Sequence, residues 1–238
     1  MYQNYIFDLY GTLVDIHTNE NKNYLWKKMS DLFACFGAFY SPTEFKKAYF
    51  STISKLEKAT GNPDVEIQIE DVFTDMLLKK NVQPQAQYIF TLGNTFRIIS
   101  RDYLRLYPGV TDFLHALKNA GKGVYLLSNA QRMFTEPEMR VLGLIDLFDG
   151  IFYSSDIGVK KPAPDFMEQL LHKYHLDRKK SIMIGNDISC DVGVANACQM
   201  DSLYIHSNIS PALKDEPIPA TYSVLDGDFT KISSLILK

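Results

Sequence analysis

The sequence predicts an α/β protein, a Rossmann-like doubly wound parallel sheet that is interrupted after its first strand by an all-helical insert. Two observations lead to this prediction. From Leu106 onward, short apolar runs alternate with segments of helical spacing, which is typical of βαβ units. Residues 16–100 instead contain apolar stripes at helical spacing and no strand-like alternation. We therefore expect a core of residues 1–15 plus 101–238 and a helical cap domain of residues 16–100.

The first expected strand ends in a short loop that carries a carboxylate. The apolar run Tyr5–Phe7 is followed by Asp8, and Gly11 then breaks the extended backbone. Open parallel sheets bind ligands at the carboxyl ends of their strands, where loops and helix N-termini leave backbone N–H groups free. Asp8 is therefore a candidate nucleophile or metal ligand, and capping of a turn is the plain alternative.

The insert is expected to contain four helices, joined to the first strand by a polar, turn-like linker at residues 15–21. Apolar residues at helical spacing indicate the first helix, because such a stripe must be buried against something. The sequence Ser41-Pro42-Thr43-Glu44 has the spacing of a capping box and begins the second helix. The expected helices cover residues 25–36, 42–59, 67–80 and 84–100.

The second part of the chain is expected to alternate strands and helices. Apolar runs such as Val124–Leu127 indicate buried strands, and glycines or prolines separate them from amphipathic segments. Polar side chains follow three of the strands, at the edge where a parallel sheet binds its ligands. The expected strands cover residues 124–127, 150–153, 181–184, 202–206 and 223–225, and the expected helices cover residues 112–119, 136–141, 164–175 and 191–197.

These polar side chains form three motifs in addition to the one at Asp8. They are Ser128-Asn129, Lys160-Lys161-Pro162 and an acidic stretch from Asn186 to Asp191. In this order the four motifs make the chain resemble the haloacid dehalogenase-like (HAD) superfamily, whose motifs are a nucleophilic Asp, a Ser or Thr, a Lys and an acidic cluster. The resemblance covers nearly the whole chain and implies a Rossmann-like core with a cap inserted after its first strand.

The resemblance also implies a role for each motif. With a phosphate monoester as substrate, Asp8 would attack phosphorus and become an aspartyl-phosphate. The Ser128 hydroxyl and the backbone N–H of Asn129 suit a phosphoryl oxygen, although an N-cap is the plain role for Ser128. Lys161 stands directly before the proline and is preferred to Lys160 as the amine that reaches Asp8 and the phosphoryl group. A solvated pair of lysines is the alternative.

A divalent cation is part of what the resemblance implies. Mg²⁺ takes oxygen ligands and few protein carboxylates. The family precedent supplies the carboxylate of the nucleophile, here Asp8, the backbone carbonyl of Tyr10 and an acid of the last motif. Asp187 is the best candidate for that acid, and Asn186 is a further candidate ligand. Asp191 is a candidate to hold a metal-bound water or the lysine.

The first motif departs from that of HAD phosphatases at Tyr10. Those enzymes usually carry a second Asp at this position, which protonates the leaving alkoxide and then activates water. A phenol with a pKa near ~10 donates a hydrogen bond but is a poor general base near neutrality. Thr12, two residues later, is expected to fix the loop and to contact the phosphoryl oxygen.

The form Asp-x-Tyr-Gly-Thr-Leu is the one found in L-2-haloacid dehalogenases, in which the Asp displaces halide from carbon without a metal. Those enzymes have one Asp in the last motif, where this chain has Asp187 and Asp191, and a Tyr where this chain has Met167. They also bind the halide with a cap Arg, and the cap segment up to about residue 96 contains no Arg. We therefore expect a Mg²⁺-dependent phosphatase, with a dehalogenase-type hydrolase and a weakly active binding or regulatory module as the alternatives.

Composition limits the partners. The 238 residues carry a net charge of −3, so no strong field attracts nucleic acid or a membrane surface, and we expect neither as a partner. No basic and apolar leader and no long apolar run appear, and the three cysteines suit free thiols, so a cytoplasmic location is expected. The expected partner is a small phosphorylated or halogenated metabolite. The sequence leads to no prediction of oligomeric state.

Overall fold

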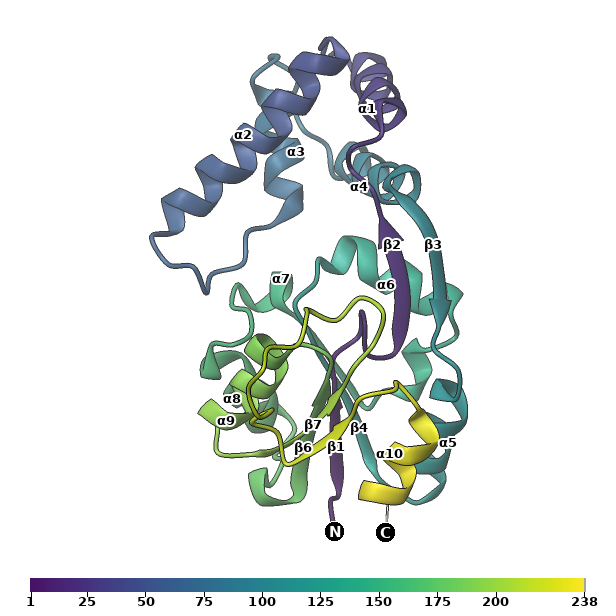
Figure 1. Ribbon diagram of the computed structural model, residues 1–238. Helices are drawn as coiled ribbons and strands as arrows, with labels where there is room; N and C mark the ends of the chain where they lie inside the picture. Colours follow the sequence, from purple (N-terminus) through teal and green to yellow (C-terminus); the bar gives the residue numbers. More distant parts are fainter. Residues whose placement is uncertain (238) are drawn as a thin grey trace.

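The structure, a computed structural model that describes residues 1–237, is built around a six-stranded parallel sheet. The strands lie side by side in the order β5-β4-β1-β6-β7-β8 (Figure 1). β1 lies between β4 and β6, with Phe7 opposite Leu126 on one side and Ile184 on the other. The predicted fold class is confirmed, and the last predicted strand is an edge strand. The strands are β1 Asn4–Phe7, β4 Gly123–Ser128, β5 Gly150–Tyr153, β6 Ser181–Gly185, β7 Asp201–Ile205 and β8 Tyr222–Val224.

Helices cover both faces of this sheet. On β1, the side chains of Tyr5 and Phe7 join a cluster with α5, α6 and α10, whereas Ile6 joins a cluster with α8 and α9 on the opposite face. Successive strand residues point to opposite faces, so a strand buried on both sides is apolar throughout. The core helices are α5 Val110–Asn119, α6 Arg132–Val141, α7 Ser154–Ile157, α8 Pro164–Lys173, α9 Gly193–Ala197 and α10 Phe229–Ile236, with short turns η1 Ile145–Leu147, η2 Arg178–Lys180 and the π-helical η3 Ile188–Val192.

The cap consists of four helices that enclose a hydrophobic core of their own. Aromatic side chains dominate this core, and their rings pack against one another at tilted and edge-on angles. Trp26, Phe33, Phe45, Phe73 and Phe96 are at most 2% exposed. A capping box at Ser41 begins α2, as predicted. The cap helices are α1 Asn23–Cys35, α2 Pro42–Thr60, α3 Ile69–Leu78 and α4 Ala86–Ser100.

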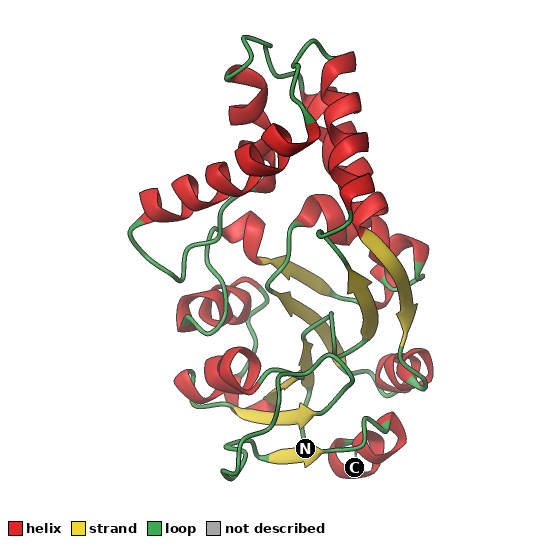
Figure 2. Cartoon of the chain, turned by 45° about the horizontal axis from the view of Figure 1, so that its top comes forward, coloured by secondary structure: helices red, strands yellow, loops and turns green. Residues whose placement is uncertain are grey.

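The prediction of a turn-like linker at residues 15–21 is wrong, and so is the prediction that the insert is helical from residue 16. The strand β2 Val14–Thr18 pairs with β3 Arg101–Leu106 in an antiparallel ribbon that connects the core to the cap (Figure 2). In β2, Val14 and Ile16 alternate with the polar residues Asp15 and His17, but this pattern spans only five residues and only Val14 and Asp15 are buried. Its partner β3 lies far along the chain, and no local signal announces the pairing.

A second contact joins the cap to the core. The loop between α2 and α3 lies along residues 158–160, where Val65 forms an isolated antiparallel bridge with Val159. The amide of Glu66 donates to the carbonyl of Gly158 at 3.1 Å, and the amide of Lys160 donates to the carbonyl of Asp64 at 3.0 Å. The cap is therefore attached to the core at the ribbon, at this loop and where α4 packs against α6.

None of the helices within residues 1–237 combines the length and the apolar character needed to cross a membrane.

Candidate active site

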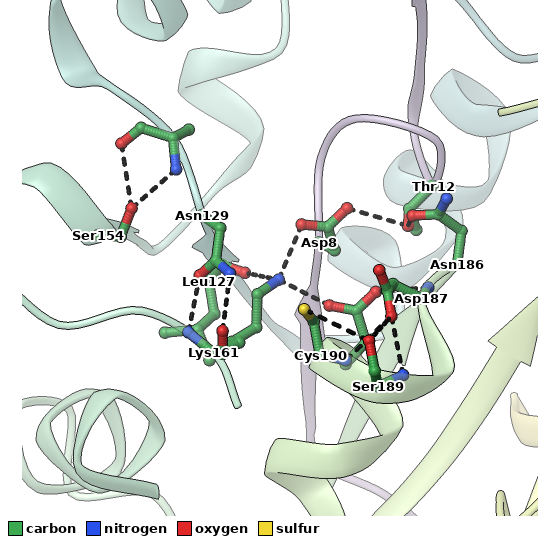
Figure 3. A network of polar contacts seen from close by, with 12 residues as sticks. Asp8, Thr12, Leu127, Asn129, Ser154, Lys161, Asn186, Asp187, Ser189 and Cys190 are labelled. Carbon is green, nitrogen blue, oxygen red and sulfur yellow. Dashed lines mark hydrogen bonds and ion pairs between the residues drawn. The ribbon is translucent and has the colours of Figure 1, made fainter. Parts of the chain in front are cut away.

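The four motifs meet at the carboxyl ends of three adjacent strands. Asp8 follows β1, Ser128 ends β4 and Asn186 follows β6, and β4 and β6 are the two neighbours of β1. Lys161 reaches the same point from the segment between α7 and α8 (Figure 3). These side chains line a hollow with a volume of about 340 Å³. Its lining residues are Asp8, Tyr10, Ser128, Asn129, Lys161, Asn186, Asp187, Cys190, Asp191, Ile209 and Pro211.

Lys161 is buried between two carboxylates. Its Nζ lies 2.8 Å from Oδ1 of Asp8 and 2.7 Å from Oδ1 of Asp191, and it donates to the carbonyl of Leu127 at 2.7 Å. Burial alone would lower the pKa of the Lys161 ammonium, but Asp191 and Asp8 outweigh it and raise that pKa above its usual value. The amine is therefore charged at neutral pH and holds one oxygen of Asp8 in place. The alternative of a solvated lysine is wrong, because Lys161 is 2% exposed.

The Asn129 side chain fixes the backbone that carries this lysine. Its Nδ2 donates to the carbonyl of Lys161 at 2.9 Å, and its Oδ1 accepts from the amide of Lys161 at 2.7 Å. The sequence pointed to the backbone N–H of Asn129, whereas the side-chain amide has this positioning role.

Ser128 presents a buried hydroxyl without a partner. The residue is 1% exposed, and its Oγ makes no hydrogen bond to any of the described residues. The N-cap role is wrong, because Gln131 precedes the first residue of α6. A buried polar group without a partner costs about 1–3 kcal/mol, and an oxygen of a bound ligand would remove that cost. Ser128 therefore suits the binding of a phosphoryl oxygen.

The nucleophile loop is held close to the last motif. The hydroxyl of Thr12 lies 3.3 Å from Oδ2 of Asp8 and 3.2 Å from Oδ1 of Asn186. Gly11 has φ +85° and packs so tightly that a Cβ would lie 2.2 Å from Nδ2 of Asn186. Only glycine fits this left-handed turn and this close approach. The contact of Thr12 with Asp8 agrees with its expected role in fixing the loop.

The last motif contributes two carboxylates with different environments. Oδ1 of Asp187 accepts from the amides of Ser189 and Cys190, at 2.8 and 3.0 Å, and so caps η3. Asp191 is 2% exposed, and its Oδ2 accepts from the amide of Asp187 at 2.9 Å. Burial raises the pKa of Asp191 to about 6, and Lys161 opposes this rise.

The charges of the hollow suit a cation. Three carboxylates, those of Asp8, Asp187 and Asp191, line it together with a single ammonium group, so the site carries excess negative charge in a poorly solvated place. Mg²⁺ prefers oxygen ligands. Tyr10, whose backbone carbonyl is an expected ligand, also lines the hollow. No cluster of three or more His, Cys, Asp and Glu side chains with metal-binding geometry occurs within residues 1–237. A Mg²⁺ ion here would thus need a backbone carbonyl and water among its ligands.

The phenol of Tyr10 points toward α6 and the junction of α4 with β3, where the cap joins the core. The hydroxyl donates to Oε2 of Glu138 at 2.5 Å and lies 3.1 Å from Oγ1 of Thr135. Burial and the charge of Glu138 raise the pKa of the Tyr10 phenol above its usual value, and the nearby Arg97 only partly opposes this. The phenol is therefore neutral at physiological pH and is no base for water.

Glu138 is a site residue that sequence reasoning missed. It is 3% exposed, and it accepts from Nε and Nη2 of Arg97 at 2.7 and 3.1 Å and from Nη1 of Arg101 at 2.9 Å. This cluster connects α6 of the core, the end of α4 in the cap, the start of β3 and the nucleophile loop. No local signal marks Glu138, because Tyr10 is 128 positions away and Arg97 is 41 positions away.

The matching family model is the haloacid dehalogenase-like hydrolase family, and it covers residues 2–199. The chain therefore belongs to the haloacid dehalogenase-like hydrolases.

Two curated relatives are phosphatases by name. The chain is 36% identical over 147 residues to a phosphoglycolate phosphatase of Nitrosococcus oceani, which covers 60% of this chain and 64% of the relative. It is 26% identical over 142 residues to a glyceraldehyde 3-phosphate phosphatase of Methanothermobacter thermautotrophicus, covering 59% and 63%. The chain thus spans just under two thirds of the length of these relatives.

Solved structures agree on the fold. A HAD phosphatase from Thermococcus onnurineus matches with a TM-score of 0.61 at 15% identity, covering 98% of this chain and 97% of the other. A dehalogenase matches equally well, with a TM-score of 0.60 at 17% identity and coverage of 100% and 98%. At these identities the likeness shows the fold alone, and it does not separate the two chemistries.

Proposed function

We propose that the protein is a Mg²⁺-dependent phosphatase that hydrolyses a small phosphorylated metabolite through an aspartyl-phosphate on Asp8. The observation that carries the proposal is the arrangement around Asp8, with the Lys161 ammonium 2.8 Å from one of its oxygens and the partnerless Ser128 hydroxyl in the same hollow. A positive charge and a hydroxyl donor in this arrangement suit the oxygens of a phosphoryl group. The names of the curated relatives support the same class of substrate.

The first step is attack by Asp8 on phosphorus. Lys161 holds Oδ1, so Oδ2, which accepts only a long hydrogen bond of 3.3 Å from Thr12, is the attacking oxygen. The bond from phosphorus to the ester oxygen breaks, the leaving oxygen takes a proton from solvent water to give the alcohol, and the phosphoryl group remains on Asp8. Ser128 donates a hydrogen bond to a phosphoryl oxygen in the transition state, and the positive charge of Lys161 offsets the charge that develops there.

A bound Mg²⁺ would offset the negative charges of Asp8 and the phosphate, which otherwise repel each other. The residues that would hold it are Asp8, Tyr10 through its backbone carbonyl, and Asp187. Asn186 is a further candidate, and Asp191 serves mainly to hold Lys161, from which it lies 2.7 Å away.

The second step is attack of water on the phosphoryl group, which releases phosphate and restores Asp8. Tyr10 stands where phosphatases of this family usually have an Asp, and its phenol is engaged with Glu138. A neutral phenol whose proton is donated to Glu138 neither protonates the leaving oxygen nor removes a proton from water. We therefore expect the second step to be the slower one, with aspartyl-phosphate accumulating during turnover.

The cap, residues 16–100, is proposed to act on the core of residues 1–15 plus 101–238 as the domain that covers the substrate. The ribbon of β2 and β3 is the connection between them. Cap closure over the hollow would exclude water from the transferred phosphoryl group.

The dehalogenase alternative rests on the Asp-x-Tyr motif. It requires an Arg that is available to a halide, but the guanidinium of Arg97 makes a bidentate contact with Glu138. Met167, which lies in α8 at the position of the dehalogenase Tyr, is fully buried in the hydrophobic cluster between α8 and the sheet. The geometry thus favours phosphate over halide.

The test is a pair of assays with one variant. We expect the protein to hydrolyse p-nitrophenyl phosphate with Mg²⁺, to lose this activity with EDTA, and to lose it in Asp8→Asn. Release of chloride from L-2-chloropropionate that resists EDTA would establish the dehalogenase instead. Silence of the folded protein in both assays would favour the binding or regulatory module.

A further inference from the structure

One wall of the catalytic hollow comes from none of the four motifs. Ile209 and Pro211 line it, and both lie in the loop between β7 and β8, which appears in yellow-green in Figure 1. Within residues 1–237, the lining of the hollow includes no residue of the cap helices α1–α4. The family match ends at residue 199, before this loop begins, so the loop lies outside the four motifs.

Hydrogen bonds fix this loop on both sides of Ile209. On one side, Nδ2 of Asn208 donates to Oδ1 of Asp15 in β2 at 3.0 Å. On the other side, Nδ2 of Asn186 donates to Oγ of Ser210 at 3.3 Å. The loop is thereby held against both the cap ribbon and the last motif. Ile209, which is 36% exposed, is thus positioned at the open side of the hollow.

The chemistry of phosphoryl transfer indicates what Ile209 would meet. In an in-line displacement the leaving oxygen lies opposite the attacking oxygen, so the alcohol portion of the substrate extends away from Asp8. The other lining residues are mostly charged or polar, whereas Ile209 and Pro211 offer only hydrocarbon. A bulky alcohol portion would collide with this wall, and a short one would fit beside it.

We propose that Ile209 is a specificity-determining residue that contacts the leaving group and limits its bulk, so that the enzyme prefers short-chain phosphate esters. The proposal rests on the proposed phosphatase function and adds the substrate class to it. Pro211 lines the hollow beside Ile209, and the hydrogen bonds of Asn208 and Ser210 hold the loop in position.

The experiment compares kcat/KM for phosphoglycolate, glyceraldehyde 3-phosphate and the bulky p-nitrophenyl phosphate, each with Mg²⁺. In Ile209→Ala, the kcat/KM of the bulky ester relative to the short esters is expected to rise about tenfold over wild type, because the wall recedes. In Ile209→Trp it is expected to fall by about the same factor. Leu213→Ala is the matched control: Leu213 is a similarly exposed residue of the same loop that does not line the hollow, and its ratio is expected to equal that of wild type.

The two ways to fail are distinct. If wild type is active and the ratio stays within about twofold of wild type in both Ile209 variants, the specificity role is overturned and the phosphatase function stands. If Leu213→Ala shifts the ratio as much as Ile209→Ala does, the effect belongs to the loop as a whole, and the assignment to Ile209 is overturned. If folded wild type hydrolyses none of the three esters with Mg²⁺, the proposed function falls, and the specificity role falls with it.

Discussion

The two sides of Asp8 differ in the charged groups that surround them and in the domains that supply these groups. On the Lys161 side, every partner comes from the core, and the contacts are an ammonium between two buried carboxylates. On the Tyr10 side, the partners come from the core and the cap together, and the central group is the Glu138 carboxylate with two arginines. The first arrangement holds the carboxylate of Asp8, the proposed nucleophile, in place. The second connects the loop that carries Asp8 to the junction of α4 and β3, where the cap joins the core. One side of Asp8 therefore holds its carboxylate, and the other side links its loop to the cap.

The largest effect is expected for Lys161→Met. This change leaves Asp8 and Asp191 buried without their shared cation, and removing one partner from a buried ion pair typically costs about 3–5 kcal/mol. We expect the free energy of unfolding, measured by urea denaturation, to fall by about this amount. Lys160→Met is the control: its side chain makes no ion pair within the described residues, and we expect a change within about 0.5 kcal/mol. Equal effects of the two variants would contradict the buried contact.

A smaller loss of stability is expected for Glu138→Gln on the Tyr10 side. The change removes the charged partner of the partly exposed Arg97 and weakens the hydrogen bond from Tyr10, and each hydrogen bond to a charged group is worth about 1.5–3 kcal/mol. We expect the free energy of unfolding to fall by about 2–3 kcal/mol. Glu136→Gln, on the same helix, breaks only surface pairs with Arg132 and Arg140, and about 0–1 kcal/mol is expected there. A Glu138 variant as stable as wild type would show that the cluster contributes nothing.

Tyr10→Phe sharpens the comparison through kinetics. Because the phenol is neutral and is held by Glu138, it contributes a hydrogen bond and no base, so its loss is expected to lower kcat by about tenfold or less. The burst of product in rapid-quench measurements should persist, since Asp8 still attacks. A loss of kcat of about a thousandfold or more would show that Tyr10 acts as an essential acid or base.

The smallest effect concerns the pH dependence of Asp15 in the ribbon. Burial on its own raises the pKa of Asp15, but hydrogen bonds from Asn208, Arg105 and Tyr103 outweigh it and hold that pKa below its usual 3.8. The folded state therefore binds a proton less readily than the unfolded state. The stability that Asp15 contributes is full above the unfolded pKa and is lost as the pH falls through the lower, folded pKa.

Unfolding of wild type and Asp15→Asn across this range tests the sign. We expect wild type to be the more stable protein above about pH 5 and its advantage to shrink below about pH 4. An advantage that grows on acidification would reverse the assignment.

The difference between the two sides also explains what the sequence could predict. Asp8, Ser128 and Lys161 each carry reactive groups next to a buried strand or a proline, so local patterns located them. Glu138 lies in an ordinary helix, and its role depends on arginines that only the folded chain brings near. Ile209 is an apolar residue in a loop, which no pattern of polar groups distinguishes.

The same limit applies to the fold. The sheet and most helices follow from hydrophobic periodicity, because each element buries a face that its own sequence encodes. The ribbon of β2 and β3 was missed because the alternation of Val14 and Ile16 with polar residues covers only one short strand. Its two buried residues are Val14 and Asp15, and Arg105, which pairs with Asp15, is 90 positions away.

The attachment of the α2–α3 loop to residues 158–160 has a consequence for how substrate enters. A cap fixed only at the ribbon could swing as a rigid body, but this cap also shares two main-chain hydrogen bonds with the strand segment that leads into Lys161. Rotation of the cap would break these bonds and release residues 158–160 from the cap loop. The two hydrogen bonds of Asn129 to the backbone of Lys161 do not involve the cap, so they would keep the lysine in place while the cap moves.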